Sequence, residues 1–363
     1  IGSGPLIVRY SRQRDKIEYE AHRQWHYRDR RFPNAQLPFL AKKTSFWFAD
    51  YNAVKSAFRT KQIDYTVAGG MAGQANKSAL DDLLTTNPDM VIQVTEQSPD
   101  DRLWFRFQHR PPSPLRDIRL RRAISMAIDR RKIVDTYEFG AAMVAIPIPW
   151  PFLGYKEPPF WSELDEWHQY NPDRAKQLLA EAGYRDGFDL KFLVSSQDTF
   201  MELYDILKNM LAAVGVRLIY DVREQTDYTA LRDEGKFEGM VRGPFPEGLA
   251  GPVWPLTCFS KTSPRNYGGY EDARMEELIE KALYTLDADE QVRLLKEINN
   301  YAMDQVVDLE VYSGHYILMM QPWLHNMRNG LFLQFRWWAS WQWGKAWLDD
   351  TAPAGRGGTK LVL

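Results

Sequence analysis

The 363-residue sequence has a single cysteine, Cys258, and almost no net charge. One cysteine excludes an intramolecular disulfide and a cysteine-rich metal cage. The 46 lysines and arginines against 48 aspartates and glutamates leave a net charge of -2, so no overall field favours nucleic acid or an anionic membrane. No stretch reaches the roughly 20 apolar residues of a transmembrane helix. We therefore expect no nucleic-acid partner. Any other partner would be recognised by particular groups on the protein and not by its overall charge.

Motifs of common catalytic and metal sites are missing as well. The sequence has no Gly-x-Ser-x-Gly elbow for a nucleophilic serine. His22 and His26 could share a helix face, but no further metal-ligating residue accompanies them at ligand spacing. The paired carboxylates Asp100-Asp101 and Asp349-Asp350 are neighbours in sequence, which does not place them across a scissile bond. We expect no enzyme activity, no cofactor and no metal site.

The clearest local pattern is the segment Asn171 to Tyr184, NPDRAKQLLAEAGY, which predicts a helix. Asn171 suits its N-cap, and Gly183 its C-terminal stop. After it, the patterns predict a strand over 188–194, a helix over 203–214 and a strand over 216–222. A helix of this length between two strands is typical of a βαβ crossover, which indicates α/β architecture.

Three more helices are expected over 117–137, 272–286 and 288–303, the last with Asp287 as its cap. Two segments, 146–160 and 242–255, are rich in proline and are expected to be ordered loops. Loops on a rigid α/β scaffold often carry binding groups.

Four segments in this order resemble the extracellular solute-binding family 5, the oligopeptide-, dipeptide- and nickel-binding receptors of ABC importers. They are IGSGPLIV (1–8), AVKSAFRTKQIDYTVAG (53–69), LRDIRLRRAISMAIDRRKIV (115–134) and NPDRAKQLLAEAGY (171–184). The third segment resembles the family signature D-x-R-V-R-x-A-I-x-x-A-I-D-R, and the fourth resembles P-x-x-A-K-x-L-L-x-E-A-G-Y.

The resemblance implies a two-lobed, periplasmic-binding-protein-like fold (type II, large cluster C) with a hinge. By analogy, residues 1–101 belong to lobe I, 102–322 form lobe II, and 323–363 return to lobe I. In the family a long N-terminal stretch precedes the IGSGPL-like segment, so we expect the chain to match the C-terminal two thirds of a receptor, without the N-terminal part of lobe I.

The resemblance also implies the function. We expect a substrate-binding protein for peptide or other solute transport, which takes a small-molecule or peptide ligand into the cleft between its lobes and delivers it to an ABC permease in the membrane. The expected location is periplasmic or extracytoplasmic, with or without a lipid anchor, and the expected state is a monomer. Two alternatives stay open: a sensory or chaperone-like receptor on the same fold, and an enzyme using carboxylates such as Glu247 or Asp198.

The site residues follow from the same resemblance. In peptide-binding members an arginine precedes G-W-x-x-D-Y, whose aspartate holds the ammonium group of the ligand. Arg242 matches that arginine, Phe245 falls near the tryptophan, and Glu247 lies one position from the aspartate. If Glu247 faces the cleft, an amine-bearing ligand is expected; if it faces solvent, a neutral ligand such as a sugar or polyol is expected.

Further candidates lie on neighbouring segments. Arg232 matches a basic position on the cleft side, and the loop 195–200, with Ser196 and Asp198, matches another wall of the pocket. Rings that could contact the ligand or pack in the core are Trp150, Phe152, Trp254 and Tyr267. The C-terminal aromatic residues could form a stacking platform or pack between the lobes; they are Phe332, Phe335, Trp337, Trp338, Trp341, Trp343 and Trp347.

Overall fold

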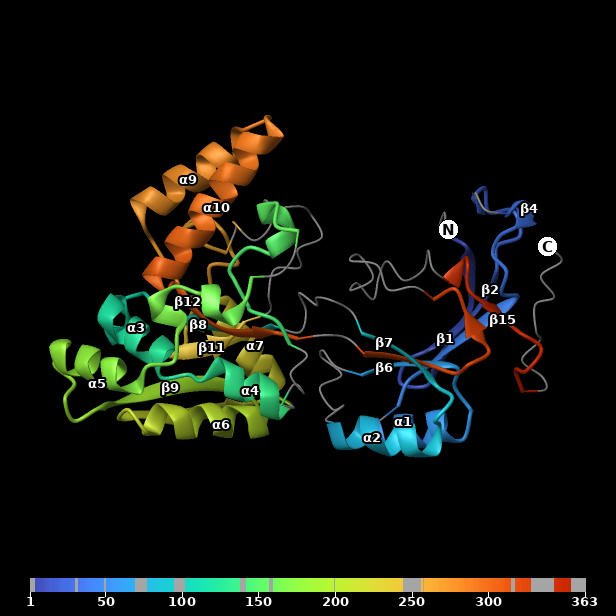
Figure 1. Cartoon of the computed structure of the whole chain (residues 1–363), viewed down its shortest axis with the longest axis horizontal. Coiled ribbons are helices and arrows are strands. Elements are labelled where there is room, and N and C mark those ends of the chain that lie inside the picture. The colour runs from blue at the N-terminus through green and yellow to red at the C-terminus, as the bar shows by residue number, and fades with distance from the viewer. Residues whose placement is uncertain are drawn as a thin grey trace. The chain divides into compact units, whose positions relative to one another are not determined.

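The computed structural model of the protein divides into two compact units (Figure 1). We name Ser98–Gly314 the central unit, and Ile1–Gln97 together with His315–Leu363 the terminal unit. The lobe boundaries expected above stay predictions. The structure describes residues 4–29, 32–48, 50–68, 77–94, 102–137, 142–156, 159–198, 200–243, 256, 258–314, 317–327 and 343–353. Within these ranges no helix has the length and apolar character needed to cross a bilayer.

A five-stranded mixed sheet with strand order β10-β9-β11-β8-β12 forms the centre of the central unit. β9 runs parallel to its two neighbours β10 and β11, whereas β8 is antiparallel to β11 and β12. The strands are β8 (Arg102–Phe107), β9 (Phe188–Ser195), β10 (Val216–Arg223), β11 (Met240–Arg242) and β12 (Asp308–Ser313). The predicted βαβ crossover is confirmed, because a helix connects β9 to the parallel strand β10.

The helices of the central unit are α3 (Ile118–Met126), α4 (Arg130–Tyr137), α5 (Pro172–Glu181), α6 (Met201–Ala212), α7 (Gln225–Asp233), α9 (Ala273–Tyr284) and α10 (Ala288–Gln305), with the short 3-10 helices η3 (Pro114–Arg116), η4 (Trp150–Leu153), η5 (Trp161–Glu163) and η6 (Glu166–His168). The predicted caps of α5 are confirmed. The Asn171 side chain accepts a hydrogen bond from the Arg174 backbone N–H at 3.0 Å, and Gly183 ends the turn with φ of 91°. Asp287 caps α10 in the same way as Asn171 caps α5, and α9 and α10 pack side by side as a hairpin (Figure 1).

One helix prediction is wrong in part, because the chain from 117 to 137 forms two helices and not one. α3 ends at Met126, and the Asp129 carboxylate then accepts a hydrogen bond from the Lys132 backbone N–H at 3.0 Å. Asp129 therefore starts a new helix, as a capping aspartate does. The apolar periodicity hides this break, since Ile128 before it and Ile133 after it are both fully buried.

Apolar side chains cover both faces of the central sheet. α3, α5 and α6 pack on one face, where Phe192 and Leu207 are fully buried. α7 packs on the other face, where Tyr228 contacts the cluster that contains Leu193 and Val241. Successive side chains of a strand point to opposite faces, so Phe192 and Leu193 on β9 belong to different cores. A separate core joins η4 to α9 and α10.

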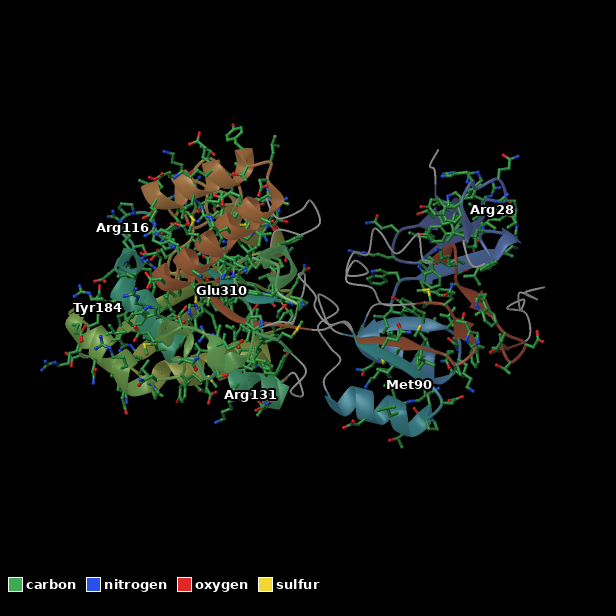
Figure 2. The ribbon with its side chains drawn as sticks, turned by 45° about the horizontal axis from the view of Figure 1, so that its top comes forward. Arg28, Met90, Arg116, Arg131, Tyr184 and Glu310 are labelled. Carbon is green, nitrogen blue, oxygen red and sulfur yellow. The ribbon has the colours of Figure 1, made fainter. Side chains whose placement is uncertain are left out.

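Several charged side chains lie inside the central unit, mostly on β8 and β12. Arg106 and Asp308 form a buried ion pair. Arg130 donates a hydrogen bond from Nε to the Glu310 carbonyl oxygen at 2.8 Å. Figure 2 shows Glu310 among the packed side chains of this unit, with the exposed Arg131 near its surface. Such charges persist in an interior because they are paired or hydrogen-bonded.

Four small sheets and two helices make up most of the described part of the terminal unit. The antiparallel sheet β1-β2-β5 contains Leu6–Arg12, Lys16–Ala21 and Lys42–Phe46, and the sheet β6-β13-β7 contains Tyr65–Ala68, Ile317–Met320 and Val91–Val94. The remaining elements are β3 (Arg28–Asp29), β4 (Phe32–Gln36), β14 (Leu324–His325), β15 (Trp347–Leu348), α1 (Tyr51–Arg59) and α2 (Lys77–Thr86).

Candidate binding site

The carboxyl ends of β9, β10 and β11 meet at one edge of the central sheet. The Ser196 backbone N–H donates to the Arg223 carbonyl oxygen at 2.7 Å, which holds the ends of β9 and β10 together. From this edge the chain continues into α6 after β9 and into α7 after β10, on opposite faces of the sheet. In α/β sheets, ligands bind outside the carboxyl ends of strands where successive connections leave to opposite faces. The candidate site is therefore placed at this edge.

Arg242, the last residue of β11, is the cation of the site. Its guanidinium Cζ lies 4.1 Å from the centroid of the Phe200 ring, and its Nη1 lies 3.9 Å from Asp198 Oδ1. Asp198 is held by two further hydrogen bonds, from the Phe200 backbone N–H at 3.0 Å and from the Tyr204 hydroxyl at 2.8 Å. The ring and the carboxylate together fix the orientation of the guanidinium.

A second arginine, Arg232, lies between two tyrosine rings in the same region. Its Cζ is 5.5 Å from the Tyr228 ring centroid and 5.4 Å from that of Tyr267. Its Nε pairs with Asp233 at 2.7 Å. The Tyr228 hydroxyl donates to the Arg242 carbonyl oxygen at 2.5 Å, which connects this group to the first arginine. The structure thus brings Arg242 together with Asp198, and Arg232 together with Tyr267, and the Tyr228 hydroxyl is the described connection between the two pairs.

The tyrosines of the site stay protonated near neutral pH. Burial raises the pKa of Tyr204 well above its usual value; Arg242 opposes that rise and Asp198 adds to it. Burial likewise raises the pKa of Tyr228. Both hydroxyls therefore act as hydrogen-bond donors, one to a carboxylate and one to a backbone carbonyl.

Other predicted residues lie elsewhere or contribute only backbone. The Ser196 side chain is exposed, and its described hydrogen bond is the backbone bond to Arg223. Trp150 is 5% exposed and packs in the core formed by η4, α9 and α10, and Phe152 is half-buried against the same core. The Trp150 indole Nε1 has no hydrogen-bond partner among the described residues. No described contact joins Trp150 or Phe152 to Arg242.

Phe245, Glu247 and Trp254 lie outside the described residues, as do the aromatic residues from Phe332 to Trp341. Their predicted roles stay predictions. In the parts of the chain that the structure describes, no group of three or more His, Cys, Asp and Glu side chains could hold a metal ion.

Tyr204 and Tyr228 were missed by the sequence reasoning. Tyr204 lies on α6 beside the apolar stripe that predicts the helix, and it is completely buried. Its sequence signal was the spacing of six residues from Asp198, which brings a hydroxyl on the first turn of α6 back to the preceding loop. Tyr228 on α7 carried no comparable signal, because its partner is a backbone carbonyl on β11, and a backbone carbonyl has no residue type that a sequence pattern could reveal.

The fold belongs to the class of periplasmic-binding-protein-like α/β proteins, as predicted. The chain superimposes on NikA from Brucella suis in complex with Fe(III)-EDTA with a TM-score of 0.77 and 16% identity, covering 96% of this chain and 68% of that one. It superimposes on the ABC transporter-associated periplasmic binding protein DppA from Helicobacter pylori, in complex with the peptide STSA, with a TM-score of 0.73 and 16% identity. That match covers 96% of this chain and 63% of DppA.

The family follows from the sequence match. The model of the bacterial extracellular solute-binding proteins, family 5 (middle), matches residues 1–266, and the chain belongs to this family. It is 25% identical over 229 residues to heme-binding protein A of Haemophilus influenzae, which is 60% of this chain and 40% of that relative. The chain therefore spans less than half the length of this curated relative.

Proposed function

We propose that this chain acts as the substrate-binding protein of an ABC importer, which captures a peptide or other small polar solute and delivers it to a membrane permease. The proposal includes an extracytoplasmic location, a monomeric state, and binding without catalysis or cofactor. Membership of family 5 supports it, as do the names of its relatives, which include a heme-binding protein and a peptide-bound protein.

The observation that carries the proposal is the arrangement of Arg242, Asp198 and Phe200 at the carboxyl edge of the sheet. A planar guanidinium suits a ligand carboxylate, because it can donate two parallel hydrogen bonds. The side chain of Arg242 is 20% exposed and that of Asp198 is 7% exposed, so both act in a partly desolvated setting. Charge interactions are stronger there than in bulk water.

The roles of the two charges differ. Arg242 would bind the anionic or carbonyl end of the solute, and Asp198 would keep the guanidinium oriented before the solute arrives. Preorganisation of this kind lowers the entropy lost on binding. Glu247, which follows β11 by five residues, stays the proposed partner for an ammonium group. Together the residues fit a zwitterionic solute such as a short peptide.

Retention of a solute tests the function directly. The purified protein is incubated with an equimolar mixture of di-, tri- and tetrapeptides, freed of excess by rapid desalting, and analysed by native and then denaturing mass spectrometry. The proposal expects one released peptide per chain, chemically unchanged. Release of hydrolysed products would indicate an enzyme, and the absence of any retained peptide would contradict the peptide assignment.

A further inference from the structure

A second cluster with unusual electrostatics lies in the terminal unit, around Lys43. Lys43 pairs with Tyr19 in the register between β2 and β5, so both side chains project from the same face of the sheet. The Lys43 Nζ lies 4.7 Å from the centroid of the Tyr19 ring and 4.6 Å from that of Trp343. The ammonium group is thus in contact with two aromatic rings.

A further ring supports the position of Trp343. Tyr65, at the start of β6, packs edge-to-face against Trp343, with centroids 5.4 Å apart and an interplanar angle of 84°. Tyr65 also contacts the apolar cluster that contains Met320 and Leu324. Trp343 is partly buried and packs against this cluster, and Lys43 is partly buried beside it.

No carboxylate neutralises Lys43 within the described residues, although its strand neighbours carry acids. Glu20 forms an ion pair with Arg9 at 2.8 Å, and Glu18 forms one with Lys16 at 2.5 Å. Because Glu18 and Glu20 alternate with Tyr19 along β2, they project from the opposite face of the sheet. Burial lowers the pKa of Lys43 to about 8. The rings offset only part of the lost hydration of an ammonium group.

We propose that Lys43, Tyr19 and Trp343 form a binding site for a small organic monocarboxylate with a planar or apolar body. One ammonium offers a single positive charge, which a carboxylate neutralises, and the rings offer an apolar surface for the rest of the ligand. A phosphate dianion would fit less well, since it favours several arginines or backbone N–H groups. The site involves none of the residues around Arg242 and does not depend on the proposed function.

The probe is 4-fluorobenzoate, followed by ligand-observed fluorine NMR with the full chain. Lys43→Met keeps the length of the side chain and removes its charge. Lys42→Met is the matched control, because Lys42 is the exposed neighbour on the other face of β5. The uncharged analogue 4-fluorobenzyl alcohol tests whether the carboxylate is needed. Thermal melting verifies that each variant is folded.

Wild type and Lys42→Met should both bind 4-fluorobenzoate saturably. The affinity of Lys43→Met for 4-fluorobenzoate should be roughly tenfold lower or more, and so should the affinity of wild type for the uncharged alcohol. The loss of binding in Lys43→Met should also be seen when Arg242→Gln is present, which separates the site from the peptide site. Equal affinity of wild type and folded Lys43→Met would overturn the proposal, and so would the absence of saturable binding to wild type.

Discussion

The guanidinium of Arg242 lies over the ring of Phe200, with Cζ 4.1 Å from the ring centroid, although the two residues belong to segments that are 42 positions apart. The parallel pairing of β9 with β11 creates this contact, because it places the loop after β9 next to the last residue of β11. The same pairing brings the Asp198 carboxylate to 3.9 Å from the guanidinium. The proposed solute site thus follows from strand order.

Replacing Arg242 should have a small effect on the free energy of unfolding. Arg242→Gln removes the ring contact and the charge that faces Asp198, and we expect a loss of about 1 kcal/mol in the free energy of unfolding. Arg217→Gln is the control, since Arg217 is an exposed arginine near the start of β10 that pairs with Asp189. It should change the free energy by less than about 0.5 kcal/mol. Urea unfolding at neutral pH measures both, and equal losses would argue against the described packing of Arg242.

Tyr204→Phe tests the support of Asp198. The variant keeps the buried ring but removes the hydroxyl that donates to the carboxylate at 2.8 Å. We expect a loss of roughly 1–2 kcal/mol in stability, because Asp198 loses one of its hydrogen bonds in a partly buried setting. Tyr284→Phe is the matched control, since Tyr284 is 80% exposed. Unchanged thermal stability of Tyr204→Phe would show that this hydrogen bond contributes nothing.

His109 should make the protein sensitive to acid. Burial, together with the positive charge of Arg121, lowers the pKa of His109 to about 3. Its Nε2 lies 2.8 Å from the Val307 carbonyl oxygen, so the neutral ring donates this hydrogen bond. An unfolded chain binds the proton below about pH 6.5, whereas the folded chain does not. Stability from this group is therefore present above pH 6.5 and is lost as pH falls toward 3.

His109→Gln removes the titrating group while it keeps a hydrogen-bond donor. Between pH 7 and pH 5, the free energy of unfolding should fall by about 2 kcal/mol more for wild type than for the variant. Urea unfolding at the two pH values measures the difference. A parallel decline of the two proteins would mean that His109 is accessible to protons in the folded state.

Lys43 should produce a pH dependence of the same sign as that of His109, but in an alkaline window. Its pKa of about 8 in the folded protein lies below the ordinary value of 10.5, so the charged form is destabilising at neutral pH. The unfolded chain keeps its proton between pH 8 and 10.5, and wild-type stability should rise through that window relative to Lys43→Met. At pH 7 the variant should be more stable by about 2 kcal/mol. A less stable Lys43→Met at neutral pH would contradict the desolvated setting.

Local sequence signals predicted the elements whose determinants are local. Asn171 and Asp287 cap helices as expected, since a capping side chain bonds to backbone only three residues away. The break before α4 was not predictable from periodicity, because both helices bury apolar residues in one core. A capping aspartate at Asp129 was the signal that could have revealed it.

The site was predictable only in part. The family motif pointed to Arg242, and the neighbouring segments to Asp198 and Arg232, but not to the tyrosines that hold them. Trp150 illustrates the limit, since a tryptophan in a proline-rich loop is compatible with ligand contact or with a core. Its packing against α9 and α10 depends on contacts more than 100 positions away. Tertiary packing of that kind leaves no local pattern.

The most direct test of the solute-binding account is peptide retention by matched arginine variants. Wild type, Arg242→Gln, Arg242→Lys and Arg217→Gln are each incubated with the same equimolar di-, tri- and tetrapeptide mixture and compared by native mass spectrometry. The account predicts a retained peptide on wild type and Arg217→Gln, at least about tenfold lower occupancy on Arg242→Gln, and an intermediate level on Arg242→Lys. Equal occupancy of folded Arg242→Gln and wild type would contradict the placement of the site at the carboxyl edge of the central sheet.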